Sequence, residues 1–555
     1  MPVALYCEPD AYLVQGRTMV GRRAAGSAFL RAAVQGRGAE PIIVYGGNKP
    51  GAEQIGMAVK GIDPAAATQW IPFHRAGLLA KVGTMFRPDP ALARDARLRL
   101  RHGAAAYSLC GITHTLSSSR ALEVIGGYPT EPLMPWDAVI CTSAAAAGIV
   151  QAELDATFDY LRWRGIGTAR PPLPQFPIIP LGVHSADFAV NDLTRRVARA
   201  ALGLAEDEVV VLYAGRLSFS TKAHPLAMYA ALSAVARCSG RRLVLVQAGQ
   251  FFNDAAAEAF RLAVEQHCTG VRPLFVDGAD ADRYAAAFRA ADLFMSLSDS
   301  IQETFGITPV EAMAAGLPVI VTDWNGYRDT VRDGIDGFRI DSWAPQAGMS
   351  EKIAARLEWD GEYEPYCARA AATVSVDMAQ LVERLTALVE NAALRRRMGE
   401  AGRRRARTDY DWAVVYRRYR QLWDELGARR RRAARDDAAL LAAAPRAHPA
   451  FEDPYRIFAH YPSHAIVAAT LVRAVPGASR AQCEALVAQP LFSHVQISFE
   501  DAGRLLVAAG DAATPLADLA ATLGLDLPAA VTLAGQLAKM QLVTLGEPSA
   551  ESDGR

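Results

Sequence analysis

The sequence predicts an α/β protein with two doubly wound, Rossmann-like domains and a small, mainly helical C-terminal domain. Two series of short β-branched runs alternate with Ala-rich helical segments, as doubly wound parallel sheets require. A proline-rich crossing at 171–183 separates the two series, and a low-complexity stretch precedes a last segment with helix-turn-helix spacing. The expected parts are a domain at 1–190, a domain at 191–427, a linker at 428–450, a small domain at 451–545 and a tail at 546–555.

The length of the chain predicts several domains, and its balanced charge indicates no charged partner. The chain has 555 residues, for which length alone predicts about three domains. Lys and Arg together number 59, and so do Asp and Glu, so no net charge directs the chain toward nucleic acid or an acidic membrane. No nucleic-acid partner is therefore expected.

The cysteines and the N-terminus predict a cytoplasmic protein. The seven Cys lie far apart, without a C-x-x-C motif or a neighbouring His cluster, which argues against a zinc site or a disulfide framework. Residues 1–13 lack the basic and apolar regions of a signal peptide, and no apolar run reaches membrane-spanning length. We therefore expect a soluble protein that at most touches a membrane surface.

The first domain is expected to carry a functional histidine at the end of a strand. Residues 3–7 and 41–46 have the composition of strands around a helix at 24–34, and a further strand at 107–112 ends in Thr113-His114-Thr115. Open α/β sheets bind ligands at the carboxyl ends of their strands, which makes His114 a candidate. The alternative is a loop histidine that is hydrogen-bonded locally.

The second domain begins with a strand at 208–213 whose following loop carries Arg216 and Lys222. An Arg offers a planar fork and a Lys a point charge, and both suit a phosphate. Two solvated surface cations are the alternative. Further strands are expected at 242–247, 273–276, 293–297 and 318–322.

The stretch from Glu303 to Gly316 reads as a loop and a short helix between two of these strands. Thr308 is expected as the N-cap, Pro309 as the first helical residue, and Gly316 as the end of the helix. The free backbone N–H groups near Phe305, Gly306 and Ile307 would then form an anion site. The two carboxylates of the stretch, Glu303 and Glu311, would accept hydrogen bonds from sugar hydroxyls. The alternative places Glu311 in a capping box and leaves Glu303 as a solvated loop residue.

Three other features favour structural interpretations. Asp280-Ala281-Asp282 matches a D-x-D pattern, but one of the two Asp is expected to be an N-cap, and no metal site is predicted. Between 376 and 426 the pattern is helical and basic. The aromatics from Trp412 to Trp423 recur at intervals of three and four, which predicts a packed face, while the arginines are either solvated or in contact with a membrane surface.

The last domain, 451–545, has the outline of a winged helix-turn-helix. Helices are expected at 517–523 and 528–540, followed by a strand at 541–545. Residues 451–555 contain six Lys and Arg against eleven Asp and Glu, whereas a reader of duplex DNA normally carries a basic face. We therefore expect this domain to have a role in protein contact or in packing.

Residues 1 to about 427 resemble the retaining glycosyltransferases of the GT-B fold, specifically glycosyltransferase family 4. Residues 303–311 are similar to the family's E-x7-E signature, and Gly215-Arg216-Leu217 with Lys222 resembles its donor diphosphate motif. The segment Pro180-Leu181-Gly182-Val183-His184 resembles an interdomain motif, although Leu181 and His184 depart from the usual Asn and Asp. Residues 111–115 resemble the active-site histidine strand, and Gly21-Arg22 the loop that faces the acceptor. The region from Phe451 onward lies outside the resemblance.

The resemblance implies a transferase that uses a nucleotide-diphosphate sugar and retains anomeric configuration without a metal or other cofactor. Arg216 and Lys222 would neutralise the diphosphate, aided by the amides of Phe305, Gly306 and Ile307. Glu311 would bind ribose hydroxyls, Glu303 would contact the donor sugar, and His114 would reach the sugar from the first domain. Gly21 and Arg22 would face an acceptor that the sequence does not identify: a glycan, a lipid or a protein.

Two alternatives remain at this point. A sugar-nucleotide epimerase on the same architecture would act without an acceptor. A non-catalytic binding or regulatory protein would owe its role to the C-terminal domain. The joint presence of Glu303, Glu311, Arg216, Lys222 and His114 argues against an inert protein.

Overall fold

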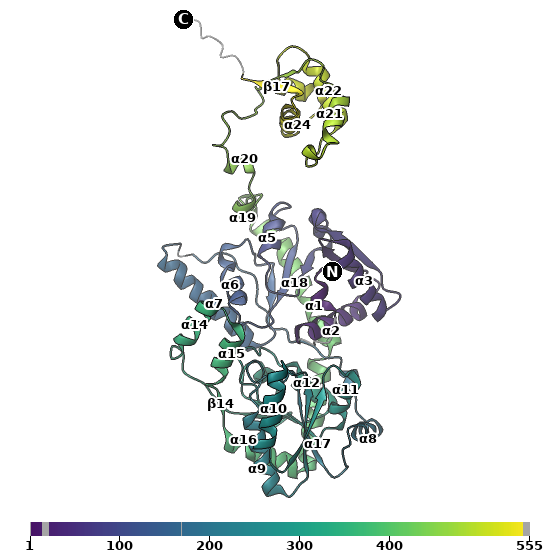
Figure 1. The fold of residues 1–555 in the computed structure, drawn as a ribbon, viewed down its shortest axis with the longest axis vertical. Helices are drawn as coiled ribbons and strands as arrows, with labels where there is room; N and C mark the ends of the chain where they lie inside the picture. Colours follow the sequence, from purple (N-terminus) through teal and green to yellow (C-terminus); the bar gives the residue numbers. More distant parts are fainter. Residues whose placement is uncertain (1, 14–20, 168, 548–555) are drawn as a thin grey trace. The chain divides into compact units, whose positions relative to one another are not determined.

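The computed structural model describes residues 2–13, 21–167 and 169–547 of the chain (Figure 1). The chain folds as two compact units, Met1–His448 and Pro449–Arg555.

The first unit begins with a parallel sheet of six strands in the order β3-β2-β1-β4-β5-β6. Its strands are short, and all except the edge strand β3 are buried, as expected for β-branched and aromatic runs between helices. The elements are β1 Ala4–Tyr6, α1 Pro9–Tyr12, α2 Gly21–Gly36, β2 Ile42–Gly46, α3 Lys49–Ile62, β3 Thr68–Pro72, α4 Leu79–Val82, β4 Thr84–Phe86, α5 Ala93–Leu100, β5 Ser108–Ile112, α6 Ser119–Gly126, β6 Ala138–Ile140 and α7 Ala144–Trp163.

A second parallel sheet of six strands follows the proline-rich crossing, in the order β12-β11-β10-β7-β8-β9. The elements are α8 Asp192–Ala201, β7 Val209–Ala214, α9 Leu226–Ser239, β8 Leu243–Gly249, α10 Asp254–His267, β9 Val271–Asp277, α11 Ala281–Ala290, β10 Leu293–Ser296, α12 Ile307–Ala315, β11 Val319–Thr322, α13 Tyr327–Thr330 and β12 Gly337–Ile340. The prediction of two doubly wound sheets, and with it the GT-B architecture that the resemblance implies, is confirmed.

More helices follow the second sheet than the sequence analysis anticipated. Residues 341–376 form the short strands β13 Ser342–Trp343 and β14 Ser375–Val376 with two helices between them, α14 Glu351–Asp360 and α15 Tyr363–Ala371. The helices α16 Met378–Glu390 and α17 Ala392–Asp409 come next.

The helix α18, Trp412–Asp436, packs back onto the first sheet. Its aromatic face lies against Phe29 of α2 and Phe86 of β4, with ring centroids 5.5 Å apart for Phe29 and Tyr419. Residues 428–436, which were expected in the linker, continue this helix, and Nη1 of Arg430 donates to the carbonyl of Ala106 at 2.5 Å. Helix α18 therefore returns from the second domain and completes the hydrophobic core of the first domain.

A buried ion pair stabilises the first sheet. Arg99 of α5 and Asp137, just before β6, have fully buried side chains and share two hydrogen bonds, of 2.5 and 2.8 Å. The Asp137 carboxylate also accepts from the amides of Leu109 and Met134 at 2.8 Å. Such a pair is tolerated because every buried carboxylate oxygen has donors.

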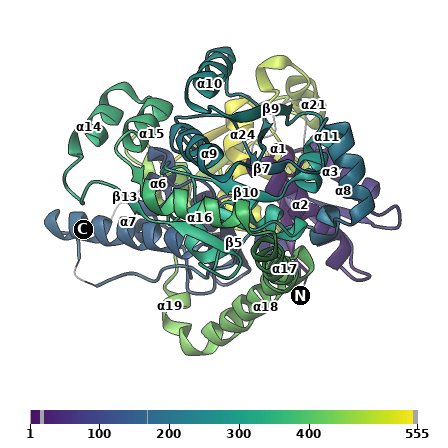
Figure 2. The same ribbon diagram turned by 90° about the horizontal axis from the view of Figure 1, so that it is seen from below.

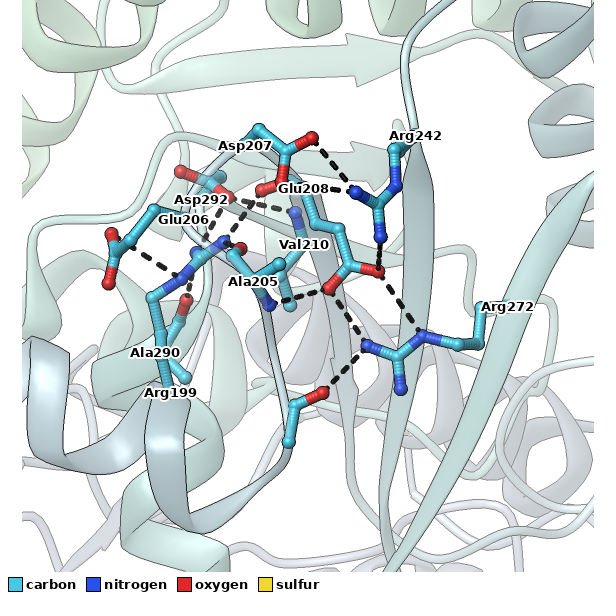
Figure 3. A network of polar contacts seen from close by, with 11 residues as sticks. Arg199, Ala205, Glu206, Asp207, Glu208, Val210, Arg242, Arg272, Ala290 and Asp292 are labelled. Carbon is cyan, nitrogen blue, oxygen red and sulfur yellow. Dashed lines mark hydrogen bonds and ion pairs between the residues drawn. The ribbon is translucent and has the colours of Figure 1, made fainter.

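A polar network fastens α8 to the amino ends of the second sheet's strands (Figure 3). Arg199 of α8 donates to the carbonyls of Ala290 and Glu208, and Asp292 accepts from Arg195 and from the amide of Val210. On the other side, the Glu208 carboxylate binds Arg272 and Arg242. This network lies at the edge opposite the carboxyl ends of the strands, so it supports the sheet without entering a ligand site.

The second compact unit contains a three-stranded antiparallel sheet, β16-β15-β17, packed against helices. Helices α23 and α24 occupy the positions expected from the sequence, with a bend of 111° between them, and β17 follows. The elements are α20 Pro454–Ile457, β15 Leu471–Ala474, α21 Arg480–Val487, α22 Phe499–Ala509, β16 Thr514–Pro515, α23 Leu516–Leu523, α24 Leu527–Lys539 and β17 Val543–Gly546.

Among the described residues, no single helix combines the length and apolar composition needed to cross a membrane. Only the bent pair of α23 and α24 meets those criteria when the two helices are taken together.

Candidate functional site

The candidate site lies where the strand order of the second sheet reverses. Strands β7 and β10 are neighbours in that sheet, while the chain proceeds outward from β7 in one direction and from β10 in the other. Loops after such strands diverge and leave a crevice at their carboxyl ends. The loop with Arg216 and Lys222 follows β7, and the loop with Glu303 follows β10.

Lys222 and Glu303 meet in this crevice. The Nζ of Lys222 lies 2.9 Å from Oε2 of Glu303, and the Glu303 side chain is only 12% exposed. Burial alone would raise the pKa of Glu303, but the Lys222 ammonium and the amides of the loop outweigh it and hold that pKa below the usual carboxyl range. Glu303 is therefore an ionised carboxylate at neutral pH, and the interpretation as a solvated loop residue is wrong.

Glu303 itself accepts hydrogen bonds from the backbone of its loop, including the Gly306 amide that was expected to be free. Its Oε1 accepts from the amide of Thr304 at 3.2 Å and from that of Gly306 at 3.0 Å. The Phe305 side chain is buried in the domain core against Tyr410, so only the backbone of Phe305 can face a ligand. An internal carboxylate thus occupies the anion site that the sequence predicts.

The prediction for the start of helix α12 is wrong by two residues. Its N-cap is Gly306, with φ +79°, and the helix begins at Ile307, so Thr308 is not the cap. A Cβ at position 306 would lie 1.9 Å from the ring of Tyr327, so both the backbone conformation and the packing require glycine. The helix ends at Gly316 as expected.

Glu311 is consequently the fifth residue of the helix and takes no part in a capping box. Its Oε2 is buried and has no hydrogen-bond partner within the protein. Burial raises the pKa of Glu311 to about 7. A buried acceptor without a donor is costly unless a ligand supplies one.

Arg216 extends over the same crevice. Its Nη2 donates to Oε1 of Gln302 at 2.8 Å, next to Glu303, while its Nε is buried without a partner. The preceding residue, Gly215, has φ +139°, and a Cβ on Gly249 would lie 1.7 Å from the Gly215 carbonyl oxygen. These glycines bring the Arg216 loop close to the neighbouring strand.

His114 reaches this region through its backbone. Its carbonyl accepts from Oγ1 of Thr304 at 3.1 Å, whereas its ring Nε2 lies 2.9 Å from the carbonyl of Pro88. The ring also borders a small apolar cavity of the first domain, together with Phe29 and Trp412. The strand ends of the two sheets therefore face each other, and Oγ of Ser143 donates to the Thr304 carbonyl at 2.6 Å as a second bond between them.

Gly21 and Arg22, expected in a loop, form the first residues of helix α2. Their side chains, and residues 14–20 before them, lie outside the described part of the chain.

Two residues of the crevice were missed in the sequence analysis. The first is Asp299, which follows β10. Its Oδ2 accepts a hydrogen bond from the amide of His224 at 3.3 Å, whereas its Oδ1 is buried without a partner. Burial raises the pKa of Asp299 to about 7. Asn325 has φ +39°, and its Nδ2 donates to the Glu303 carbonyl at 2.9 Å. The N-G dipeptide after a strand was a signal for a turn at Asn325, but no pattern marked its contact with Glu303.

The D-x-D pattern is structural, as expected. Asp280 is the N-cap of α11 and accepts from the amide of Arg283 at 3.0 Å. Within the described ranges, no three His, Cys, Asp or Glu side chains gather as metal ligands would.

The second domain is similar to a known protein family. The family model for glycosyl transferases group 1 matches residues 194–373. Residues 194–373 are thus the part of the chain that is similar to group 1 glycosyltransferases. The match includes Arg216, Lys222, Glu303 and Glu311, and it confirms the family indicated by the sequence motifs.

Curated relatives of the group 1 domain include D-inositol 3-phosphate glycosyltransferases. The protein from Segniliparus rotundus is 34% identical over 185 residues, which are 32% of this chain and 38% of that protein. The protein from Mycobacterium tuberculosis is 31% identical over 245 residues, which are 43% of this chain and 48% of that protein. The matched segments thus span less than half of those relatives.

Solved structures with a similar course of the chain include HepE of Anabaena in complex with UDP and sucrose-phosphate synthase of Thermosynechococcus elongatus. HepE is 14% identical with a TM-score of 0.49, covering 77% of this chain and 100% of its own. The synthase is 19% identical with a TM-score of 0.49, covering 77% and 99%.

Proposed function

We propose that the protein is a retaining glycosyltransferase that moves a sugar from a nucleotide-diphosphate sugar to an acceptor. The observation that carries this proposal is the Lys222–Glu303 pair at the strand-order reversal of a group 1 glycosyltransferase domain. Lys222 provides a cation for the leaving diphosphate, and Glu303 provides a carboxylate for the sugar. Nζ of Lys222 lies 2.9 Å from Oε2 of Glu303.

The diphosphate is bound by Arg216 and Lys222 from the loop after β7. Arg216 brings a guanidinium whose Nε is buried and unpartnered, and Lys222 brings a primary ammonium. Cations positioned where negative charge develops stabilise a departing phosphate. Because two side-chain cations neutralise the diphosphate, the proposed reaction needs no metal ion, and undiminished transfer in a chelator would support this.

Donor binding rearranges the carboxylate of Glu303. When Lys222 forms an ion pair with the diphosphate, Glu303 loses its own ion pair with Lys222. Its carboxylate can then accept hydrogen bonds from the donor sugar. The amides of Thr304 and Gly306, which Glu303 now occupies, are then released toward the donor. The Lys222–Glu303 pair is thus the contact that the diphosphate would replace.

Glu311 binds the ribose in this proposal. Two neighbouring ribose hydroxyls are donors of the kind that its unpartnered Oε2 lacks. His114 serves the sugar side from the first domain, and Gly21 and Arg22 serve the acceptor.

A thermal-shift panel of nucleoside diphosphates and nucleotide sugars tests the donor class, because a ligand of the folded state raises the unfolding midpoint. Transfer is then measured by mass spectrometry with the best donor and a panel of acceptors. The panel includes inositol 3-phosphate, because the D-inositol 3-phosphate glycosyltransferases match this chain. Nuclear magnetic resonance of the product gives its anomeric configuration. Epimerised donor without transfer, or no midpoint shift with any nucleotide, would contradict the proposal.

A further inference from the structure

The helices α14 and α15, in residues 341–376, extend from the second sheet toward the first domain. They lie beside α6 and α7 in both views (Figures 1 and 2). Helix α14 has no buried residue, whereas α15 buries Cys367 and Ala371. The contacts of α15 therefore decide where this segment docks.

One contact of α15 crosses to the first domain. The hydroxyl of Tyr363, the first residue of α15, lies 2.7 Å from Oγ of Ser117. Ser117 belongs to the segment between β5 and α6, residues 113–118, which also contains His114. This hydrogen bond thus joins the inserted helix to the loop that carries the histidine.

A second contact of α15 reaches the loop with the diphosphate-binding lysine. Oγ of Ser220 donates to Oε1 of Glu364 at 2.7 Å. Ser220 is buried, and its hydroxyl also lies 3.1 Å from Oγ of Ser218, which is 2.8 Å from Oγ1 of Thr221. Lys222 follows directly, so Glu364 anchors the hydroxyl network from which the lysine extends.

We propose that Glu364 and Tyr363 are positioning residues of the donor site: Glu364 fixes the loop that presents Lys222, and Tyr363 fixes the domain arrangement at which the His114 loop meets the donor. This inference rests on the proposed glycosyltransferase function and adds a part that the E-x7-E and diphosphate motifs do not contain. Two adjacent side chains of one short helix serve two different loops of the site.

The two residues are expected to affect different constants. Glu364 acts on the loop that presents Lys222, so its loss weakens nucleotide binding. Tyr363 acts across the two domains, so its loss slows turnover but leaves the affinity for a free nucleoside diphosphate unchanged. A residue with only a packing role would lower the unfolding midpoint and change neither constant.

The experiment compares Glu364→Ala, Tyr363→Phe and Ser117→Ala in the full chain. Matched controls on the same helix are Glu362→Ala, at its exposed N-cap, and Tyr366→Phe, which removes a phenolic hydroxyl one turn further on. The nucleoside diphosphate that gives the largest thermal shift is titrated by calorimetry, and kcat and KM are measured with the matching nucleotide sugar.

Glu364→Ala should raise the Kd of the nucleoside diphosphate about fivefold, as expected for loss of one hydrogen bond in the loop. Tyr363→Phe and Ser117→Ala should each lower kcat about fivefold, and the double variant should lose no more than either single variant, because both remove one bond. Unchanged Kd in Glu364→Ala, unchanged kcat in Tyr363→Phe, or additive losses in the double variant would overturn the proposal.

Hydrogen exchange separates this inference from the proposed function. Tyr363→Phe and Ser117→Ala should both speed exchange in α15 and in residues 115–119, with or without any nucleotide. If the wild-type chain bound no nucleotide but this coupling persisted, the proposed function would fail while the bridge by α15 stood. If nucleotide binding and transfer were found without the coupling, the role of Tyr363 would fail alone.

Discussion

The Nζ of Lys222 and Oε2 of Glu303 lie 2.9 Å apart although 81 positions separate the two residues in the chain. The sheet order explains the contact, because β7 and β10 are neighbours and each residue follows one of these strands. The pair joins the cation proposed for the diphosphate to the carboxylate proposed for the sugar, and the predictions about catalysis follow from it.

Lys222→Ala and Glu303→Gln should each lower kcat/KM for the nucleotide sugar by about two to three orders of magnitude, the range known for loss of one preorganised electrostatic group. Lys222→Ala should also weaken nucleoside diphosphate binding. Steady-state kinetics and calorimetry measure both effects. Lys60→Ala, an exposed change in α3, is the control. Full activity in either site variant would exclude the mechanism.

His114→Ala should lower kcat and leave the Kd of a nucleoside diphosphate unchanged, because the proposed contact is with the sugar. The wild-type ring is bonded to the Pro88 carbonyl, so the variant also tests whether that bond matters for stability. Calorimetry gives the Kd and thermal unfolding gives the midpoint. A lower midpoint with unchanged kcat would assign His114 the locally bonded structural role.

Glu311→Gln should raise stability relative to the wild type as pH increases. Burial raises the pKa of Glu311 to about 7, above the ordinary value of 4.5, so the folded state favours its protonated form. Its stabilising contribution is complete below 4.5 and is lost as pH rises through about 7.

The midpoint difference between Glu311→Gln and the wild type should therefore grow from about pH 4.5 to pH 8. Asp299, whose pKa burial also raises to about 7, is present in both proteins and does not contribute to the difference. The variant should bind nucleoside diphosphates more weakly, because an amide nitrogen replaces one acceptor oxygen. A midpoint difference independent of pH would show that Glu311 has a partner.

Asp137→Ala should destabilise the first unit by about 3–5 kcal/mol, because it leaves the buried Arg99 without its partner. Asp137→Asn should cost less, since its carbonyl oxygen still accepts hydrogen bonds. Urea unfolding measures both. Asp159→Ala breaks an exposed pair with Arg162 and should cost at most about 1 kcal/mol. Equal losses in the buried and the exposed variants would contradict the assignment.

Truncation after His448 should leave nucleotide binding and the unfolding of the first unit unchanged. Truncation after Gly427 should lower the midpoint, because it removes the bond from Arg430 to Ala106 and the buried Ala433. The two truncated proteins differ only in residues 428–448, so each controls the other. Identical midpoints would show that residues 428–448 are a linker in function, as the sequence suggested.

The regular elements could be predicted because their signals are local. The β-branched runs gave the strands of the second sheet from β7 to β11, and the recurrence of aromatics gave the buried face of α18. The start of α12 could not be predicted in this way. Thr308-Pro309 is a strong local cap signal, but the ring of Tyr327, the first residue of α13, requires the glycine cap two residues earlier.

The residues of the candidate site show the same difference between local signals and tertiary contacts. The sequence alone indicated the residues that we propose for the chemistry: Arg216, Lys222, Glu303 and Glu311 stand at spacings that resemble those of a known family, because side-chain type and separation are covalent properties of the chain. The tertiary structure alone decided which of them interact. Glu303 occupies its own loop amides, Glu311 lacks a partner, and Tyr363 of α15 reaches Ser117, because these contacts depend on which strands are neighbours and which side chains are buried together.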